Sequence, residues 1–175
     1  IERDFSGTEY KVGDVIYLDP SIIIKISKAE HLNESRQFIS DIYQEVKELD
    51  GVWSEEIPDN HYIRVTFEKN LTSNRDITIY SRITNGNPNI EVYEKDGTTK
   101  IAEFSQIINK EYNKIFLDGS SGVGLPEEHS QDVFDLKVVG GSIEIEHIID
   151  PSPPDINFTD PTPANATTTS NTSVL

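Results

Sequence analysis

Apolar and polar positions alternate most regularly in residues 61–82. Ile63, Val65 and Phe67 are each separated by one polar residue, and the segment RDITIYSR repeats the pattern after a polar turn. Period-2 alternation in a stretch rich in β-branched and aromatic residues predicts half-buried strands. One face of such strands packs on a core and the other faces water. Residues 61–82 therefore predict two neighbouring strands with one apolar face.

Segments of the same character recur along most of the chain. They predict further strands at residues 10–18, 21–27, 90–95, 98–104, 112–117, 131–139 and 142–149. The isoleucine run within residues 21–27 predicts burial on both faces of that strand. Asp96-Gly97 and Gly140-Gly141 predict the turns of two hairpins, because glycine readily adopts positive φ. About eight to ten short strands with almost no helix imply an all-β fold, an antiparallel β-sandwich of the jelly-roll type.

Residues 29–60 allow two interpretations. Apolar residues recur at helical spacing from Arg36 to Leu49, which favours an amphipathic helix. Alternatively, Asp50-Gly51 is a two-residue hairpin signal, with residues 45–49 and 52–57 as the paired strands. We expect a short helix or turn near residues 36–43, followed by the hairpin.

The composition changes at Asp150, which divides the chain into two predicted parts. Residues 1–150 form the β-sandwich domain, and residues 151–175, rich in Pro, Thr, Asn and Ser, form an extended arm. The end of the arm is β-branched and predicts a strand donated to a neighbouring copy, with these candidate assembly residues: Thr167, Thr168, Thr169, Val174 and Leu175. Head-to-tail contacts of this kind grow filaments when they do not close. The alternatives are that the arm folds back on its own sandwich or begins a second domain.

The formal net charge of −16 changes which partners are expected. A strongly acidic chain is repelled by nucleic acid and by anionic lipid surfaces, so neither is a predicted partner. Such a charge is typical of a highly solvated surface suited to a cell exterior. The sequence has no run of about 18 apolar residues and predicts no membrane insertion. The absence of cysteine excludes disulfides, thiol catalysis and Cys-based zinc sites.

Five Asn-X-Ser/Thr tripeptides are candidate glycosylation sites, at Asn33, Asn70, Asn157, Asn165 and Asn171. The last three lie in the arm, where loop-like composition favours access by a transferase. We therefore expect an extracellular, cell-surface glycoprotein. Because the chain begins at Ile1 without methionine, we also expect a mature product or a fragment of a larger protein.

Metal binding has little support in the residue pattern. The four histidines are not at metal-ligand spacing, and His147, which alternates with Ile145 and Ile149, is expected to point towards the core. Calcium prefers oxygen ligands, and the candidates in predicted turns are Asp14, Asp19, Asp118, Glu127 and Glu128. No Asp-x-Asp-x-Asp-Gly loop is present, so chance clustering among 31 acidic residues is the alternative.

The pattern also argues against catalysis. Glycoside hydrolysis needs two carboxylates facing each other across a cleft. Glu144 and Glu146 lie on the same side of one predicted strand, which a solvated sheet face explains more simply. Ser120 and Ser121 lie in a Gly/Ser loop that has neither a Gly-x-Ser-x-Gly elbow nor the Gly-Lys-Ser/Thr ending of a phosphate loop. We predict that the chain is not an enzyme and needs no cofactor.

Several pieces of the chain together resemble a known kind of domain. They are RQFISDIYQEV, DGVWSEEI, YIRVTFEKNLTSNRDITIYSR, IEVYEKDG and QDVFDLKVVGGSIEIEHIIDP, which cover residues 36–151. They resemble a repeat-type domain of very large secreted surface proteins of small-genome archaea, and the tail resembles the opening of the Ig-like domains that follow there. The strand order also resembles galactose-binding-like (discoidin-type) jelly rolls. The resemblance implies a structural or adhesive module, with ligands in the loops at one end.

Three functions follow as expectations. The first is a non-catalytic extracellular structural protein, a glycosylated surface-layer or filament subunit that assembles head-to-tail through its arm into a homopolymer or against tandem neighbouring domains. The alternative is a carbohydrate-binding or adhesion module of a larger surface protein. The third is an accessory domain of a secreted hydrolase whose catalytic domain lies elsewhere. Trp53, the single tryptophan, is expected to pack in the core, with a sugar-stacking platform as its alternative role. Exposed Trp53 or Tyr112 beside a shallow pocket would favour the carbohydrate-binding function.

Overall fold

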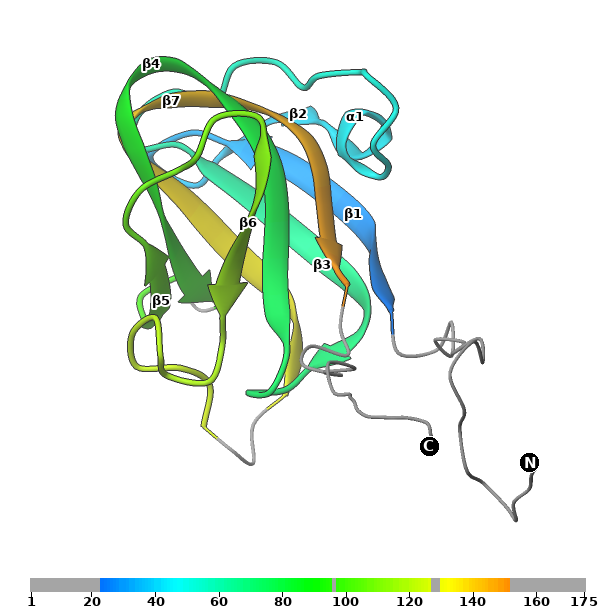
Figure 1. The fold of residues 1–175 in the computed structure, drawn as a ribbon, viewed down its shortest axis with the longest axis vertical. Helices are drawn as coiled ribbons and strands as arrows, with labels where there is room; N and C mark the ends of the chain where they lie inside the picture. The colour runs from blue at the N-terminus through cyan, green and yellow to red at the C-terminus, as the bar shows by residue number, and fades with distance from the viewer. Residues whose placement is uncertain (1–22, 96, 127–129, 152–175) are drawn as a thin grey trace, which may run out of the picture. The chain divides into compact units, whose positions relative to one another are not determined.

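A computed structural model describes residues 23–95, 97–126 and 130–151 (Figure 1). Its elements in chain order are β1 (Ile24–Leu32), β2 (Phe38–Asp41), α1 (Tyr43–Val46), β3 (Tyr62–Leu71), β4 (Asp76–Glu94), β5 (Lys100–Phe104), β6 (Glu111–Phe116) and β7 (Gln131–Asp150). The pairings between these strands are antiparallel. The all-β prediction is therefore confirmed.

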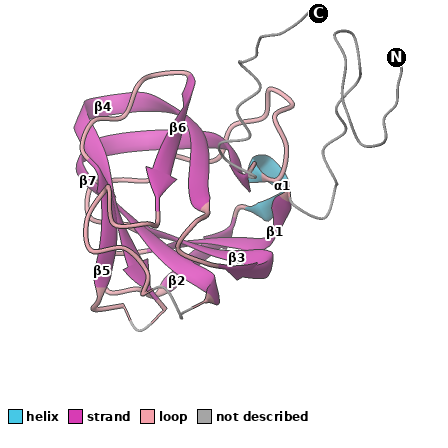
Figure 2. Cartoon of the chain, turned by 60° about the horizontal axis from the view of Figure 1, so that its bottom comes forward, coloured by secondary structure: helices cyan, strands magenta, loops and turns pink. Residues whose placement is uncertain are grey.

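The two longest strands, β4 and β7, organise the fold. The strand order is β2-β1-β3-β7-β4-β5, with β6 on β4 and a further β1–β7 pairing. The first half of β7 pairs with β3 and with the end of β4, whereas its second half pairs with the start of β4. Both strands bend, so each contributes to both layers of the sandwich (Figures 1 and 2).

The alternation seen in the sequence places the core between the layers. Ile63, Val65 and Phe67 of β3 are buried, as predicted, and so are Ile77 and Ile79 of β4. Removing apolar surface from water stabilises the fold by roughly 25 cal/mol per Å². These buried faces therefore supply the main driving force for folding, and the opposite faces are left for polar and aromatic side chains.

The bend in β4 and β7 corrects the hairpin predicted at Gly140-Gly141. β7 runs through both glycines as one strand, opposite Gly86 of β4, where the register shifts. Gly86 and Gly140 have φ of +69° and +89°. A Cβ on Gly141 would lie 2.3 Å from the carbonyl oxygen of Asn85. Glycine is found at tight bends and close backbone contacts inside strands, and also in turns. The same two glycines are therefore compatible with a hairpin turn and with a bend in one continuous strand.

β4 and β5 form the predicted hairpin around Gly97, while Asp96 lies outside the described residues. The amide of Glu94 donates to Thr99 O at 2.9 Å, and the amide of Gly97 donates to Glu94 O at 2.8 Å. Gly97 has φ +82°, as the turn requires. The strand predicted at residues 112–117 is β6, which begins and ends one residue earlier.

Residues 29–60 follow neither interpretation. The stretch from 38 to 41 is strand β2, the helix α1 has only four residues, and Asp50-Gly51 turns no hairpin. Instead, Ser54 N donates to Ile145 O at 2.8 Å and Ile57 bridges to Ile143. The edges of β1 and β7 offer this segment backbone partners, and these tertiary contacts override the local helical and hairpin signals.

Two further predictions concern the ends of the chain. The isoleucines of residues 21–27 were expected to be buried on both faces, but Ile24 and Ile26 are buried while Lys25 is exposed. That strand is therefore half-buried. The strand predicted at residues 10–18 and the arm, with Thr167, Thr168, Thr169, Val174 and Leu175, lie outside the described residues, apart from Pro151.

Candidate functional site

Aromatic side chains gather on the outer face of β4, β6 and β7. Tyr80 of β4 lies opposite Tyr112 of β6 on one side and His147 of β7 on the other. The ring centroids of Tyr80 and Tyr112 are 5.0 Å apart, and those of Tyr112 and His147 are 5.9 Å apart. Tyr112 is 43% exposed, and its hydroxyl lies 2.9 Å from His147 Nδ1. Register thus brings three rings from three strands onto one accessible surface.

Trp53 extends this surface from the loop between α1 and β3. Its ring centroid lies 6.0 Å from that of Tyr80, in a tilted arrangement. Trp53 is half-buried on the outer face, so the expectation that it packs in the core is wrong. We call Trp53, Tyr80, Tyr112 and His147 the aromatic row.

A fixed ion pair borders the aromatic row. The guanidinium carbon of Arg82 lies 4.2 Å from the centroid of the Trp53 ring. Arg82 Nε donates to Glu144 Oε1 at 2.7 Å, and its Nη2 lies 2.6 Å from the same oxygen. A cation over an aromatic face and a charge-assisted hydrogen bond together hold the guanidinium in one orientation. The site therefore offers ring faces flanked by oriented donors and a carboxylate acceptor.

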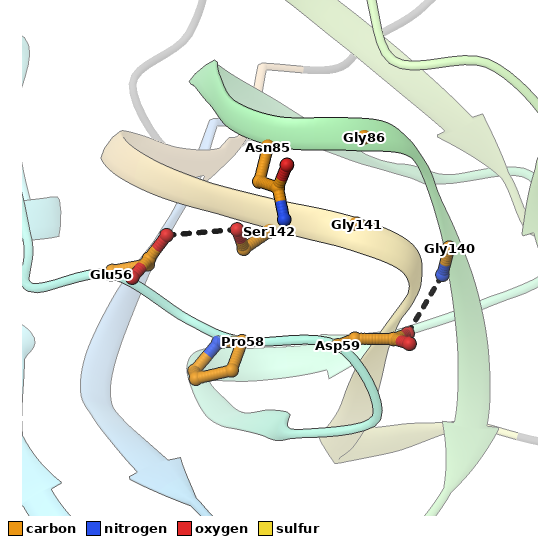
Figure 3. Close-up of a pocket in the computed structure, with 8 residues that line it drawn as sticks. All are labelled: Glu56, Pro58, Asp59, Asn85, Gly86, Gly140, Gly141 and Ser142. Atoms are coloured by element: carbon orange, nitrogen blue, oxygen red, sulfur yellow. Dashed lines mark hydrogen bonds between the residues drawn. The ribbon is translucent and has the colours of Figure 1, made fainter.

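A pocket of about 460 Å³ opens where β4 and β7 bend (Figure 3). Its lining residues are Glu56, Pro58, Asp59, Asn85, Gly86, Gly140, Gly141 and Ser142. We call it the bend pocket. Its volume lies within the range of about 300–1,000 Å³ that is usual for small-molecule sites. The glycines let the backbone form its wall, because the bend has no room for side chains there.

Hydrogen bonds fix the two carboxylates of the bend pocket. Glu56 Oε2 accepts from Thr84 Oγ1 at 2.6 Å and from Ser142 Oγ at 2.8 Å. These two bonds lower the pKa of the Glu56 carboxyl below its usual value. Asp59 Oδ1 accepts from the amide of Gly140 at 2.8 Å (Figure 3). Both side chains are thus held as ordered acceptors.

The aromatic row and the bend pocket adjoin on one face of the sheet. Arg82 and Thr84 are two positions apart on β4, and Glu144 and Ser142 are two positions apart on β7. Side chains two positions apart in a strand share a face. Trp53 and Glu56 come from a single segment that lies along the edge of β7. The two parts of the site therefore lie on the same face.

His147 and Glu146 differ from their predicted positions. His147 does not point into the core, since its ring contacts Tyr112 on the outer face. Burial lowers the pKa of its imidazole, partly offset by Glu146 and Glu48. Glu146 is only 5% exposed, and its carboxylate accepts from the amide of Gly51. An irregularity in the β4–β7 register at Tyr80 changes which residues of β7 face outward, and sequence alternation could not show it.

A second polar cluster, around His31, was not predicted. His31 is 3% exposed, its Nδ1 contacts Glu55, and its Nε2 lies 2.8 Å from His61 Nδ1. Ser40 Oγ donates to the same carboxylate of Glu55 at 2.5 Å. The serine thus faces a carboxylate rather than an imidazole base, which is not the arrangement of an activated nucleophile. Burial and neighbouring His31 lower the pKa of His61, while Glu34 opposes the shift.

Among the predicted calcium and glycosylation residues, the structure describes Asp118, Asn33 and Asn70. Asp118 accepts from Ser120, whereas Asp14, Asp19, Glu127 and Glu128 lie outside the described residues. Within the described ranges, no three His, Asp or Glu side chains are arranged to hold a metal ion. Asn33 Oδ1 accepts hydrogen bonds from the backbone amides of Ser35 and Gln37 in a tight loop. Asn70 is exposed near the end of β3. The candidate sites at Asn157, Asn165 and Asn171 lie outside the described residues.

No protein-family model matches the chain, and no curated protein matches it. In the part of the chain that the structure describes, no helix has the length and apolar character to cross a membrane. Function must therefore be inferred from the geometry of the aromatic row and the bend pocket.

Proposed function

We propose that this domain is a non-catalytic carbohydrate-binding module of an extracellular surface protein. The observation that carries the proposal is the aromatic row, with its 43% exposed Tyr112, beside the oriented Arg82–Glu144 pair. Aromatic rings offer a large, rigid, apolar contact area with a polar handle. The apolar C–H faces of sugar rings pack on such surfaces, and their hydroxyl groups exchange hydrogen bonds with neighbouring guanidinium and carboxylate groups.

The shape of the site favours an oligosaccharide over a single sugar. The row draws its residues from the loop that carries Trp53 and from three strands, and it continues into the bend pocket. Binding without turnover fits the carboxylates beside the aromatic row, because Glu144 is paired with Arg82 and Glu146 is directed at the amide of Gly51. In the bend pocket, two hydrogen bonds lower the pKa of Glu56, which disfavours its protonated form. General acid catalysis would require a carboxyl group free to protonate a leaving group.

Replacing Tyr112 with Ala is expected to weaken binding of the recognised oligosaccharide at least about tenfold, which corresponds to about 1.4 kcal/mol. The substitution removes the most exposed ring of the row. Ligands are found first by glycan-array screening of the full chain, and affinities are then measured by isothermal titration calorimetry. Phe38→Ala is the matched control, because it removes an exposed ring from β2, a strand that contributes no residue to the aromatic row or the bend pocket. Equal affinities for wild type and Tyr112→Ala would contradict the proposal.

Head-to-tail assembly through the C-terminal arm is a second candidate function, and one observation favours it. β2 ends the strand order, pairs with β1, and leaves Phe38 and Ile39 60% and 45% exposed. An apolar edge strand is a ready site for pairing with a strand from another chain. The β-branched segment 167–175 of a second copy is the proposed occupant.

Removal of residues 152–175 is expected to abolish polymers or larger species in sedimentation velocity and electron microscopy. Ile39→Lys in the full chain should have the same effect, because a charge at the edge disfavours strand addition. Lys28→Ala is the matched control, because it changes the charge at an exposed position of β1 and leaves the edge strand β2 unchanged. Polymers that survive truncation, or a full chain that is always monomeric, would reject this second function.

A further inference from the structure

We infer that the bend pocket is a subsite for a sugar unit that carries a free ammonium group. The inference rests on the proposed carbohydrate-binding function and names the class of sugar that this part of the site takes. Among the side chains that line the pocket, Pro58 is the only apolar one. A hydrophilic ligand therefore fits the lining better than an apolar one.

The charge of the pocket selects the ligand. Glu56 and Asp59 both present carboxylates, and neither forms an ion pair with a Lys, Arg or His within the described part of the chain. Arg82, which lies on the same face, is engaged by Glu144. The pocket thus carries two negative charges without a cation of its own. An ammonium group complements that field, whereas the carboxylate of a uronic acid would be repelled by it.

The acceptors are ordered before a ligand arrives. Both hydrogen bonds to Glu56, from Thr84 and Ser142, end on Oε2, so Oε1 remains for a ligand. The bond to Asp59 from Gly140 ends on Oδ1, which leaves Oδ2. Because hydrogen bonds already hold these two side chains, they lose little further conformational freedom when a ligand binds.

A divalent cation is a weaker explanation of the same two carboxylates. Calcium takes about six to eight oxygen ligands. Within the described residues, no group of three acidic or histidine side chains is arranged around one point. The pocket also has the volume of a small-molecule site rather than of an ion cage. A hydroxylated ammonium ligand accounts for both the charge and the space.

The test compares short oligosaccharides that differ in charge. The full chain is titrated with glucosamine oligomers, their N-acetylated counterparts and galacturonic acid oligomers, with tetralysine as a probe of general cation binding. Calorimetry gives the affinities, and amide shifts of Gly86, Gly140 and Gly141 report on the pocket. We expect glucosamine oligomers to bind at least about tenfold more tightly than the acetylated ones.

Two charge-neutralising variants make the assignment specific. Glu56→Gln is expected to weaken binding of glucosamine oligomers about tenfold or more, while Glu68→Gln, at an exposed position of β3, changes it little. Glutamine can still accept the bonds from Thr84 and Ser142, and thermal unfolding of both variants checks that the fold is kept. Equal effects of the two variants would overturn the inference, because they would show only attraction to a chain of net charge −16.

The outcomes separate the subsite from the proposed function. If Tyr112→Ala abolishes oligosaccharide binding and Glu56→Gln does not change it, the subsite is wrong and the carbohydrate-binding function stands. If acetylated oligomers or tetralysine bind as tightly as glucosamine oligomers, the ammonium-sugar assignment is also overturned. If Glu56→Gln weakens binding and Tyr112→Ala does not, the subsite stands and the proposed role of the aromatic row fails.

Discussion

Replacing Asp135 with Ala is expected to lower the free energy of unfolding by about 3–5 kcal/mol, the usual cost of removing one partner of a buried ion pair. The side chain of Asp135 is fully buried. It accepts from Arg64 Nε and Nη2 at 2.7 and 2.9 Å, and Arg36 Nη1 lies 2.8 Å away. Without the carboxylate, two partly buried guanidinium groups would lose the acceptor that they share. Chemical denaturation monitored by circular dichroism measures the change.

Lys100→Ala is the matched control for this experiment. Lys100 pairs with Glu91 and Glu103, but its side chain is 44% exposed. Exposed ion pairs stabilise proteins by about 0–1 kcal/mol, so little change is expected. A loss below about 1 kcal/mol in Asp135→Ala would contradict the view that this buried carboxylate holds the Arg36 loop against the sheet.

Gly141→Ala is expected to destabilise the fold by about 2–4 kcal/mol, within the range of severe overpacking. The added Cβ would lie 2.3 Å from Asn85 O and 2.9 Å from Pro88 Cδ, so the strands must separate at the bend. The same shift would open the wall of the bend pocket. Thermal and denaturant unfolding measure the change in stability. Titration with a ligand of the bend pocket measures whether the altered wall changes the affinity.

Gly51→Ala separates crowding from backbone strain. Gly51 has φ +87°, but an added Cβ would meet no atom within 4 Å. The cost there is that of a strained φ alone, about 1 kcal/mol. If Gly51→Ala proves as costly as Gly141→Ala, the close approach of β4 and β7 is not what requires glycine at the bend.

Strand positions could be predicted because alternation reports directly on which face is buried. Val65 and Ile79, for example, follow that pattern. The topology could not be predicted at Gly140-Gly141, since a glycine pair serves a hairpin turn and a bend in a continuous strand equally well. The helical spacing of residues 36–49 was misleading because pairing with β1 satisfied the backbone of β2.

The candidate site was visible in the sequence only as isolated residues. The sequence pointed to Trp53 and Tyr112 as aromatic candidates. Tyr80, whose ring contacts both of them, lies on a third element, and its position relative to them depends on the strand register. Glu56 and Asp59 meet residues 85–86 and 140–142 only after the bend is formed. His31 and His61 are likewise 30 residues apart, so no local spacing could reveal their contact.

The most direct test of the carbohydrate-binding function uses the single tryptophan of the chain as a reporter. Oligosaccharides selected by array are titrated into the ¹⁵N-labelled full chain, and the indole N–H of Trp53, the Nε–H of Arg82 and the amide of Tyr112 are followed. We predict saturable shifts of these three signals with one dissociation constant, lost in Tyr112→Ala. Saturable binding that leaves all three signals unchanged, or an array without a ligand, would contradict the account.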